Sequence, residues 1–133
     1  MYTTYNKYPE WHKLIIFRAI FICMTDSRAK GYRVERKIGL LFGKHGWRVI
    51  RAGRSLGEAD LLCLKNKECL LLQIKSTNKD KFYYYGLKDA TIDGFPFYLI
   101  VDFGYGKVRI LSPKGIVSKD EGEDLVSFLE RIH

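Results

Sequence analysis

The chain has 133 residues, of which 47% are hydrophobic and 14% aromatic, which predicts one globular domain with a buried core and excludes a disordered chain. The formal net charge is +8, and the window 27–54, with nine basic residues and one acid, accounts for all of it (9 − 1 = +8). Such clustering is typical of a protein that binds a polyanion, although a solubilising surface or a contact with an anionic membrane would also concentrate charge.

The cysteines and histidines show no spacing typical of a metal site, so we expect neither a zinc site nor a cysteine nucleophile. Three cysteines without a disulfide framework, Cys23, Cys63 and Cys69, predict a reducing, cytoplasmic location. The apolar stretch 14–24 contains Arg18 and is too short to span a bilayer. We expect no membrane partner, and we expect this stretch to be a buried or partner-packed helix, with a strand as the alternative.

The predicted elements follow an aromatic and apolar extension, residues 1–25, and belong to one domain over residues 26–133. Asp26 or Ser27 caps a helix that runs to about His45 and is closed by Gly46. The helix is followed by a strand over 47–52 and a flexible loop over 53–57. Further along, we expect an irregular segment over 78–94 with a short helix near 86–92, a hairpin of strands 97–103 and 107–111, and a C-terminal helix over 123–132.

The segments 57–62 and 70–75 flank the turn-like pair Asn66-Lys67. If that pair closes a hairpin, residues whose numbers sum to 133 face one another. Asp60 then faces Gln73, Glu58 faces Lys75, and strand alternation places all four on one side. This face is either a solvated outer surface or a polar site, and the other face carries the apolar residues Leu61, Cys63, Leu70, Leu72 and Ile74.

Four segments carry a family resemblance: residues 27–35 (SRAKGYRVE), 45–55 (HGWRVIRAGRS), 59–62 (ADLL) and 73–77 (QIKST). In this order they resemble the archaeal Holliday junction resolvases of the PD-(D/E)xK nuclease superfamily. The resemblance is good over 27–77, loose to about residue 111, and absent elsewhere. It implies an α/β, restriction-endonuclease-like fold with a central mixed β-sheet flanked by helices. It also implies a homodimeric endonuclease that cuts four-way DNA junctions and depends on Mg²⁺, for which Mn²⁺ can substitute.

By position, the resemblance gives each matching residue a role. Asp60 is the central metal ligand, and Glu35 completes the acidic set through water. Lys75 orients or deprotonates the attacking water, and Ser55 lies on a mobile loop that reaches the scissile strand. The family has glutamate where this chain has Gln73, whose amide oxygen can ligate magnesium without contributing charge.

Two further groups of residues have candidate roles. Glu58 either restores the charge that the glutamine lacks or only pairs with Lys75 or Arg54. The aromatic run 82–85 either stacks on distorted bases or packs alternate rings on the sheet. The candidate DNA contacts are basic: Arg28, Lys30, Arg33, Arg36, Arg51, Arg54, Lys79 and Lys81.

The sequence therefore predicts a metal-dependent, structure-selective DNA endonuclease that resolves four-way junctions. One alternative is a restriction-like or RNA-processing nuclease on the same fold, because a fold does not fix a substrate. The other is a catalytically silent nucleic-acid-binding module, which the glutamine at position 73 keeps open.

Overall fold

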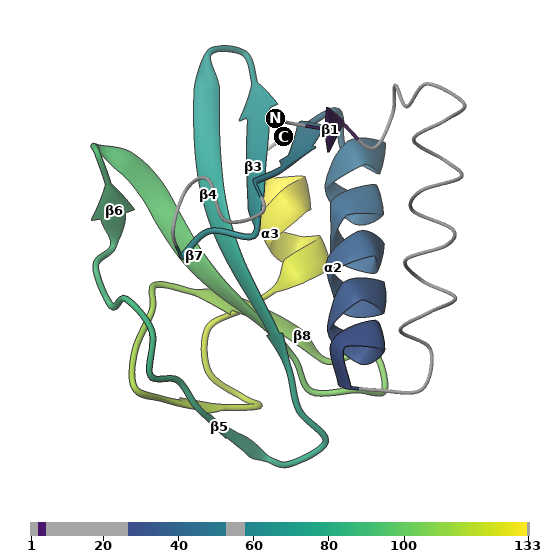
Figure 1. Ribbon diagram of the computed structural model, residues 1–133, viewed down its shortest axis with the longest axis vertical. Helices are drawn as coiled ribbons and strands as arrows, with labels where there is room; N and C mark the ends of the chain where they lie inside the picture. The colour runs from purple at the N-terminus through teal and green to yellow at the C-terminus, as the bar shows by residue number, and fades with distance from the viewer. Residues whose placement is uncertain (1–2, 5–26, 53–57, 133) are drawn as a thin grey trace.

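The computed structural model describes residues 3–4, 27–52 and 58–132, so the predicted loop over 53–57 and all of the predicted extension except residues 3–4 lie outside the described residues. Figure 1 shows helices against a twisted sheet. The elements are β1 (Thr3–Thr4), α2 (Ser27–Lys44), β2 (Arg48–Arg51), β3 (Leu61–Lys65), β4 (Glu68–Ser76), β5 (Lys81–Tyr83), β6 (Thr91–Ile92), β7 (Phe95–Asp102), β8 (Val108–Leu111), β9 (Ile116–Ser118), β10 (Glu123–Asp124) and α3 (Leu125–Arg131).

The main sheet has the strand order β1-β2-β3-β4-β7-β8-β10, and β6 pairs with β7. The β4–β7 pair is parallel and the other pairs are antiparallel, so the sheet is mixed, as predicted. A parallel pair needs a crossover connection, and the segment between β4 and β7 contains β5. That strand pairs with β9 in a second, two-stranded sheet.

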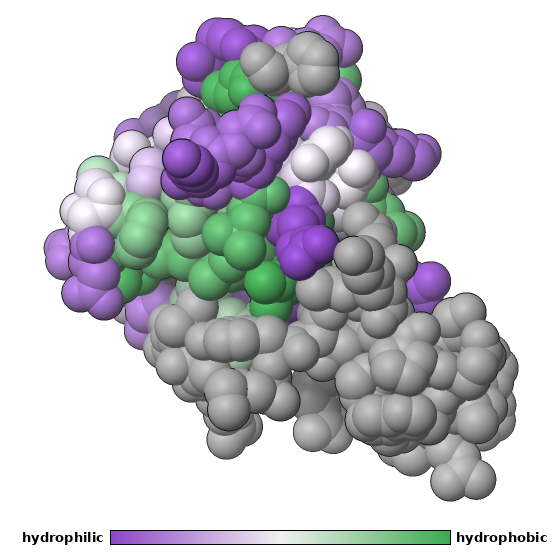
Figure 2. Space-filling view, turned by 90° about the horizontal axis from the view of Figure 1, so that it is seen from above, coloured by the Kyte–Doolittle hydropathy of each residue, from purple (hydrophilic) through white to green (hydrophobic). Residues whose placement is uncertain are grey.

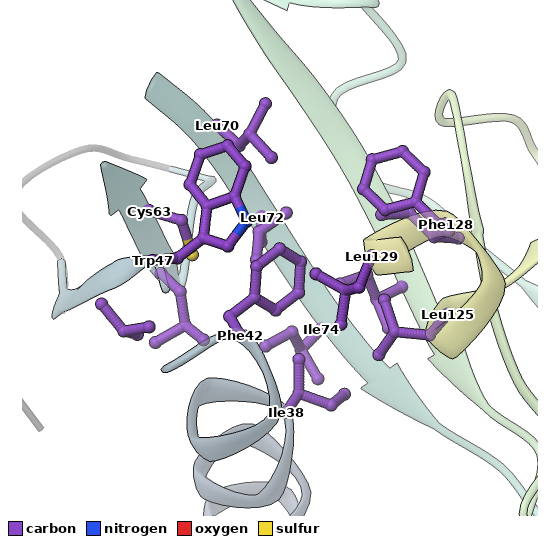
Figure 3. Close-up of a cluster of buried hydrophobic side chains, with 14 of the residues drawn as sticks. Ile38, Phe42, Trp47, Cys63, Leu70, Leu72, Ile74, Leu125, Phe128 and Leu129 are labelled. Atoms are coloured by element: carbon purple, nitrogen blue, oxygen red, sulfur yellow. The ribbon is translucent and has the colours of Figure 1, made fainter. Parts of the chain in front are cut away.

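The first face of the main sheet is covered by α2 and α3. Ile38 and Phe42 of α2 and Leu125, Phe128 and Leu129 of α3 pack against Leu72 and Ile74 of β4, as Figure 3 shows. The inward residues of α3 match the predicted C-terminal helix. Full burial of a large apolar side chain contributes roughly 1.5–3 kcal/mol, so this face holds most of the stabilising core.

The second face of the sheet carries two smaller buried clusters. One joins Leu99 and Val101 of β7 to Tyr84 and to Val117 of β9. The other joins Leu71 of β4 to Ala59 and Phe97. The second face is therefore covered by the β5–β9 sheet and its connections rather than by a helix.

Over residues 61–65 and 68–72, the hairpin of β3 and β4 has the predicted register: Leu61 faces Leu72 and Lys65 faces Glu68, so paired numbers sum to 133. Asp60 precedes β3 and its amide donates to the Leu72 carbonyl, so the expected facing pairs Asp60–Gln73 and Glu58–Lys75 are not part of this ladder. Asn66 and Lys67 form the turn with φ of 48° and 67°, the left-handed values that a two-residue hairpin turn of type I′ requires. Cys63 is buried on the helix side and Cys69 packs on the other face of the sheet, in accordance with strand alternation.

Two predicted elements differ from the structure. The short helix near residues 86–92 was a wrong prediction: the segment is irregular and ends in β6, because Leu87 and Ile92 pack onto the second face and the Phe97 amide donates to the Ala90 carbonyl at 2.9 Å. The C-terminal helix begins at Leu125, two residues later than expected. Asp124 still pairs with β8, and its carboxylate caps α3 by accepting from the Ser127 amide at 3.1 Å.

Within the described part of the chain, no helix is long and apolar enough to cross a membrane. Figure 2 looks onto the end of the molecule that bears the β3–β4 turn, and apolar side chains gather there between hydrophilic ones. A groove of about 360 Å³ lies at this turn, lined by residues that include Trp47, Cys69, Leu70 and Phe95. Because β4 runs away from this turn, its final residues reach the opposite end of the molecule (Figure 1).

Candidate functional site

Asp60 lies just before β3 and connects three strands. Its amide donates to the Leu72 carbonyl of β4 at 2.7 Å, and its carbonyl accepts from the Ala52 amide after β2 at 3.0 Å. Its carboxylate Oδ2 accepts from the Ile74 amide of β4 at 2.9 Å. The hairpin register therefore brings the Asp60 carboxylate against the strand that carries Gln73 and Lys75.

The environment of Asp60 opposes its negative charge. Burial raises the pKa of this carboxyl group above its usual value, and the charge of Glu58 raises it further. The Ile74 hydrogen bond and the charges of Lys75 and Arg51 act in the other direction but do not cancel the effect of burial. A desolvated carboxylate of this kind gains more than an exposed one from a cation placed beside it.

Gln73 is buried, with 6% of its surface exposed, on the face of β4 opposite to Leu72 and Ile74. Gln73 is therefore covered rather than solvated, whereas Glu58 and Lys75, which were expected on the same face, are exposed. The Gln73 Oε1 atom has no hydrogen-bond partner among the described residues. A buried oxygen without a partner is costly, so this atom is suited to accept a ligand.

Lys75 follows two residues later and is exposed, at the point where β4 leaves the core. A cavity of about 240 Å³ lies between this end of β4 and α2, lined by Gly31, Val34, Ile74, Lys75 and Ser76. The end of β4 is therefore open to a ligand from the side of the basic helix.

Glu35 lies on α2, and its side chain is only 14% exposed. Arg51 Nε lies 3.0 Å from Glu35 Oε1, and the Arg51 guanidinium covers the Tyr32 ring at 4.7 Å. Since Arg51 also lowers the pKa of Asp60, this arginine electrostatically links the two predicted acids. A role for Arg51 in DNA contact stays a prediction.

The oxygen atoms that could bind the expected cation come from few side chains. Within residues 3–4, 27–52 and 58–132, no group of three or more His, Cys, Asp and Glu side chains could hold a metal ion. The amide of Gln73 is not counted in such a group, and its buried Oε1 atom, which has no hydrogen-bond partner among the described residues, is a neutral oxygen donor. Magnesium prefers oxygen ligands and keeps several waters, so Asp60 and Gln73 together fit it.

The candidate DNA contacts fall into two groups. Exposed side chains lie along α2 and just beyond β4: Lys30, Arg33, Arg36, Lys79 and Lys81. The structure does not describe the side chain of Arg28, and Arg54 and the predicted loop serine Ser55 lie outside the described residues. The aromatic run alternates as one interpretation predicted, with Phe82 and Tyr84 packed inward and Tyr83 and Tyr85 exposed.

Two residues of the site region were missed by the sequence reasoning. Asp102 of β7 is buried, faces Ser76 in the register, and accepts from Lys37 Nζ of α2 at 3.0 Å. Tyr84 is buried, and its pKa is raised by burial and then by the charges of Glu58 and Asp60. The position of Asp102 at the end of a strand and the alternation of rings around Tyr84 can be seen in the sequence. Neither pattern shows what these two side chains contact.

The mixed sheet, the acid before β3, the amide and lysine on β4 and the basic helix beside them together define the restriction-endonuclease-like nuclease fold. Comparison with known proteins agrees. The family of archaeal Holliday junction resolvases (Hjc) matches residues 26–94, slightly more than half of the chain. The chain therefore belongs to the archaeal Holliday junction resolvase family, a family of nucleases.

The fold is also similar to a solved structure, the Archaeoglobus fulgidus Hjc, a Holliday junction resolvase from an archaeal hyperthermophile. The two chains are 14% identical with a TM-score of 0.58, and the match covers 76% of this chain and 96% of the other. At that identity the likeness shows the fold alone. No curated protein sequence matches the chain.

Proposed function

We propose that this protein is a Mg²⁺-dependent, structure-selective endonuclease that resolves four-way DNA junctions as a homodimer. The observation that carries the proposal is the geometry of the β3–β4 hairpin. A half-buried carboxylate is held by the strand that presents an amide oxygen at Gln73, without a partner among the described residues, and an exposed ammonium group at Lys75. Family membership gives the substrate class.

Each side chain has a part that follows from its environment. Asp60 supplies a desolvated carboxylate whose direction is set by the Ile74 amide. Gln73 supplies a neutral oxygen, and the exposed Lys75 is placed to offset the charge of a phosphate and to hold or move a proton on the attacking water. A bound Mg²⁺ would lower the pKa of a coordinated water and stabilise charge on the phosphate.

Glu35 and the basic helix support the binding of the substrate. The ion pair with Arg51 of β2 orients the Glu35 carboxylate. Lys30, Arg33 and Arg36 on the same helix are exposed and can contact phosphates. The homodimer is proposed because a junction has two symmetry-related strands to cut and a two-fold dimer supplies two matched sites.

A silent binding module remains the second candidate function, because the strand that carries Lys75 presents the neutral amide of Gln73 rather than a carboxylate. The test is cleavage of a four-way junction, a linear duplex of the same sequence, and an RNA duplex, each with Mg²⁺ and with EDTA. We expect cleavage of the four-way junction when Mg²⁺ is present, and no cleavage of the junction when EDTA is present. Junction binding without cleavage would favour the silent module, and equal cleavage of the linear duplex or of the RNA would contradict selectivity for junctions.

A further inference from the structure

The second face of the sheet contains two buried oxygen atoms that lack a hydrogen-bond partner among the described residues: Gln73 Oε1 and the Tyr84 hydroxyl. The two residues are 6% and 2% exposed. Buried polar groups are nearly always hydrogen-bonded, because leaving one unpaired costs about 1–3 kcal/mol. Two such atoms near one site indicate a polar guest that serves both.

The two residues lie on the same face of the sheet. Gln73 faces Leu99 of β7 in the register, and Leu99 packs in the same buried cluster as Tyr84. The charges of Glu58 and Asp60 act on the Tyr84 hydroxyl. The hydroxyl therefore approaches the carboxylate set from the side of the sheet opposite to the helices.

The position of Tyr84 is fixed by its surroundings. Its amide donates to the Gly115 carbonyl at 2.8 Å, and Lys88 Nζ lies 5.8 Å from the ring centroid. The hydroxyl rests against Gly86, where an added Cβ would lie only 2.4 Å from the oxygen. Only glycine fits there while the ring keeps this place, so the hydroxyl group is held at one point.

The chemistry of Gln73 requires such a fixed group. A glutamate presents an oxygen to a cation in either orientation of its carboxylate. A glutamine presents an oxygen in one orientation of its amide and a donor NH₂ group in the other, and the NH₂ group would repel a cation. A chain with glutamine at this position therefore needs a neighbour that selects the correct orientation.

We propose that Tyr84 is a positioning residue that sets the orientation of the Gln73 amide through one bridging water. The water accepts from the Tyr84 hydroxyl and donates to Gln73 Oε1, whose second lone pair stays available for a cation beside Asp60. Water bridges of this kind are nearly as favourable as direct hydrogen bonds. The inference deepens the proposed function and rests on it for its catalytic consequence.

The test uses Tyr84→Phe, which removes the hydroxyl and keeps the ring. Tyr83→Phe and Tyr85→Phe are matched controls, because these neighbouring rings are 56% and 88% exposed. In the metal-free protein, the side-chain amide NMR signals of Gln73, assigned by their loss in Gln73→Glu, should shift in Tyr84→Phe and not in the controls. Unchanged Gln73 signals in a folded Tyr84→Phe protein would overturn the proposal.

The catalytic arm uses the Gln73→Glu background. With glutamine at position 73, Tyr84→Phe should raise the Mg²⁺ concentration for half-maximal cleavage about tenfold, the effect of one hydrogen bond of about 1.4 kcal/mol. With glutamate, whose oxygens are equivalent, it should change that concentration less than about twofold. An equal effect in both backgrounds would show a merely structural role. If the wild type cleaves no substrate, the proposed function fails, and the metal-free NMR comparison still decides the role of Tyr84.

Discussion

Asp60 takes part both in the backbone pairing between strands and in the proposed chemistry. Its peptide group joins β2 to β4, and its carboxylate accepts from the Ile74 amide of β4. The cost of this placement is desolvation, which raises the pKa of the carboxyl group. A proposed active site that keeps a charged group partly buried without its cation sacrifices stability in the free protein.

The first prediction concerns this cost. Because the folded-state pKa of Asp60 is raised, protonation favours folding at low pH, and that contribution is lost as pH rises through the folded pKa. The neutral Asp60→Asn variant should therefore melt higher than the wild type at pH 7, by about 4 °C for about 1 kcal/mol. When thermal unfolding is measured from pH 7 down to pH 3, the difference in melting temperature between the variant and the wild type should become smaller. Equal melting temperatures at pH 7, or a gap that widens in acid, would contradict the assignment.

The second prediction concerns the glutamine at position 73. Gln73→Glu should retain or raise activity and lower the Mg²⁺ concentration for half-maximal cleavage, because it adds charge beside Asp60. The same change should destabilise the metal-free protein, since the position is only 6% exposed and a carboxylate there would be desolvated. Activity that falls while metal affinity stays constant would remove Gln73 from the proposed metal ligands.

Glu58 allows a sharper form of this experiment. Its charge acts on both Asp60 and Tyr84 although the residue is exposed. If Glu58 compensates for the missing carboxylate, Glu58→Gln should damage cleavage more in the wild type than in Gln73→Glu. Strictly additive effects on the Mg²⁺ titrations of the four proteins would reject compensation.

Among the elements, α2 has one apolar and one basic face. Ile38 and Phe42 pack into the core, while Arg33 and Arg36 are exposed to solvent. The ion pair between Lys37 Nζ and Asp102 Oδ2, at 3.0 Å, joins this helix to the end of β7. The helix therefore presents its charges at a constant position relative to the hairpin.

The third prediction is that Arg33→Glu and Arg36→Glu weaken binding to junction and linear DNA alike. Each lost phosphate contact should reduce the slope of log K against log salt concentration by about 1. Binding is measured by fluorescence anisotropy from 50 to 300 mM salt, a range of roughly a factor of six. Lys67→Glu is the control, because this exposed lysine lies on the β3–β4 turn at the other end of the molecule. Equal losses in the control and the arginine variants would show that only net charge matters.

The elements also show what the sequence could predict. The hairpin register followed from Asn66-Lys67 and strand alternation, both local signals. The strands β5 and β9 were missed because they are three residues long and pair across a separation of more than thirty residues. Whether the Gln73 face was solvated or covered depended on that pairing, so the burial of Gln73 and Tyr84 was not predictable from local pattern.

At the scale of the whole molecule, the two faces of the sheet carry different parts of the protein. The helix face supplies most of the core and the basic surface, and the second face holds Gln73 and Tyr84 under the β5–β9 sheet. The ends of the parallel strands β4 and β7 lie side by side at the proposed site. Its groups therefore come from segments distant in sequence, and their geometry depends on the whole fold.

The fourth prediction concerns assembly. The apolar segment over 14–24 lies outside the described residues, and its predicted burial, either in its own domain or in a dimer, stays a prediction. We expect a truncated chain that begins at Met24 to lose stability or to dissociate, because that much exposed apolar surface is unfavourable. Sedimentation and thermal unfolding measure both effects. A truncated chain that stays soluble, dimeric and equally heat-stable would refute the role of the segment in assembly.

The central claim is that the end of the β3–β4 hairpin is the catalytic centre of a junction-cleaving enzyme. The most direct measurement is single-turnover cleavage of a four-way junction by Lys75→Ala, with junction affinity measured on the same sample. Lys67→Ala, which removes an exposed lysine on the β3–β4 turn at the other end of the hairpin, is the control. The account predicts that Lys75→Ala lowers cleavage by at least about a hundredfold with little loss of affinity, while Lys67→Ala cleaves nearly as the wild type does. Cleavage by Lys75→Ala at the wild-type rate would contradict it.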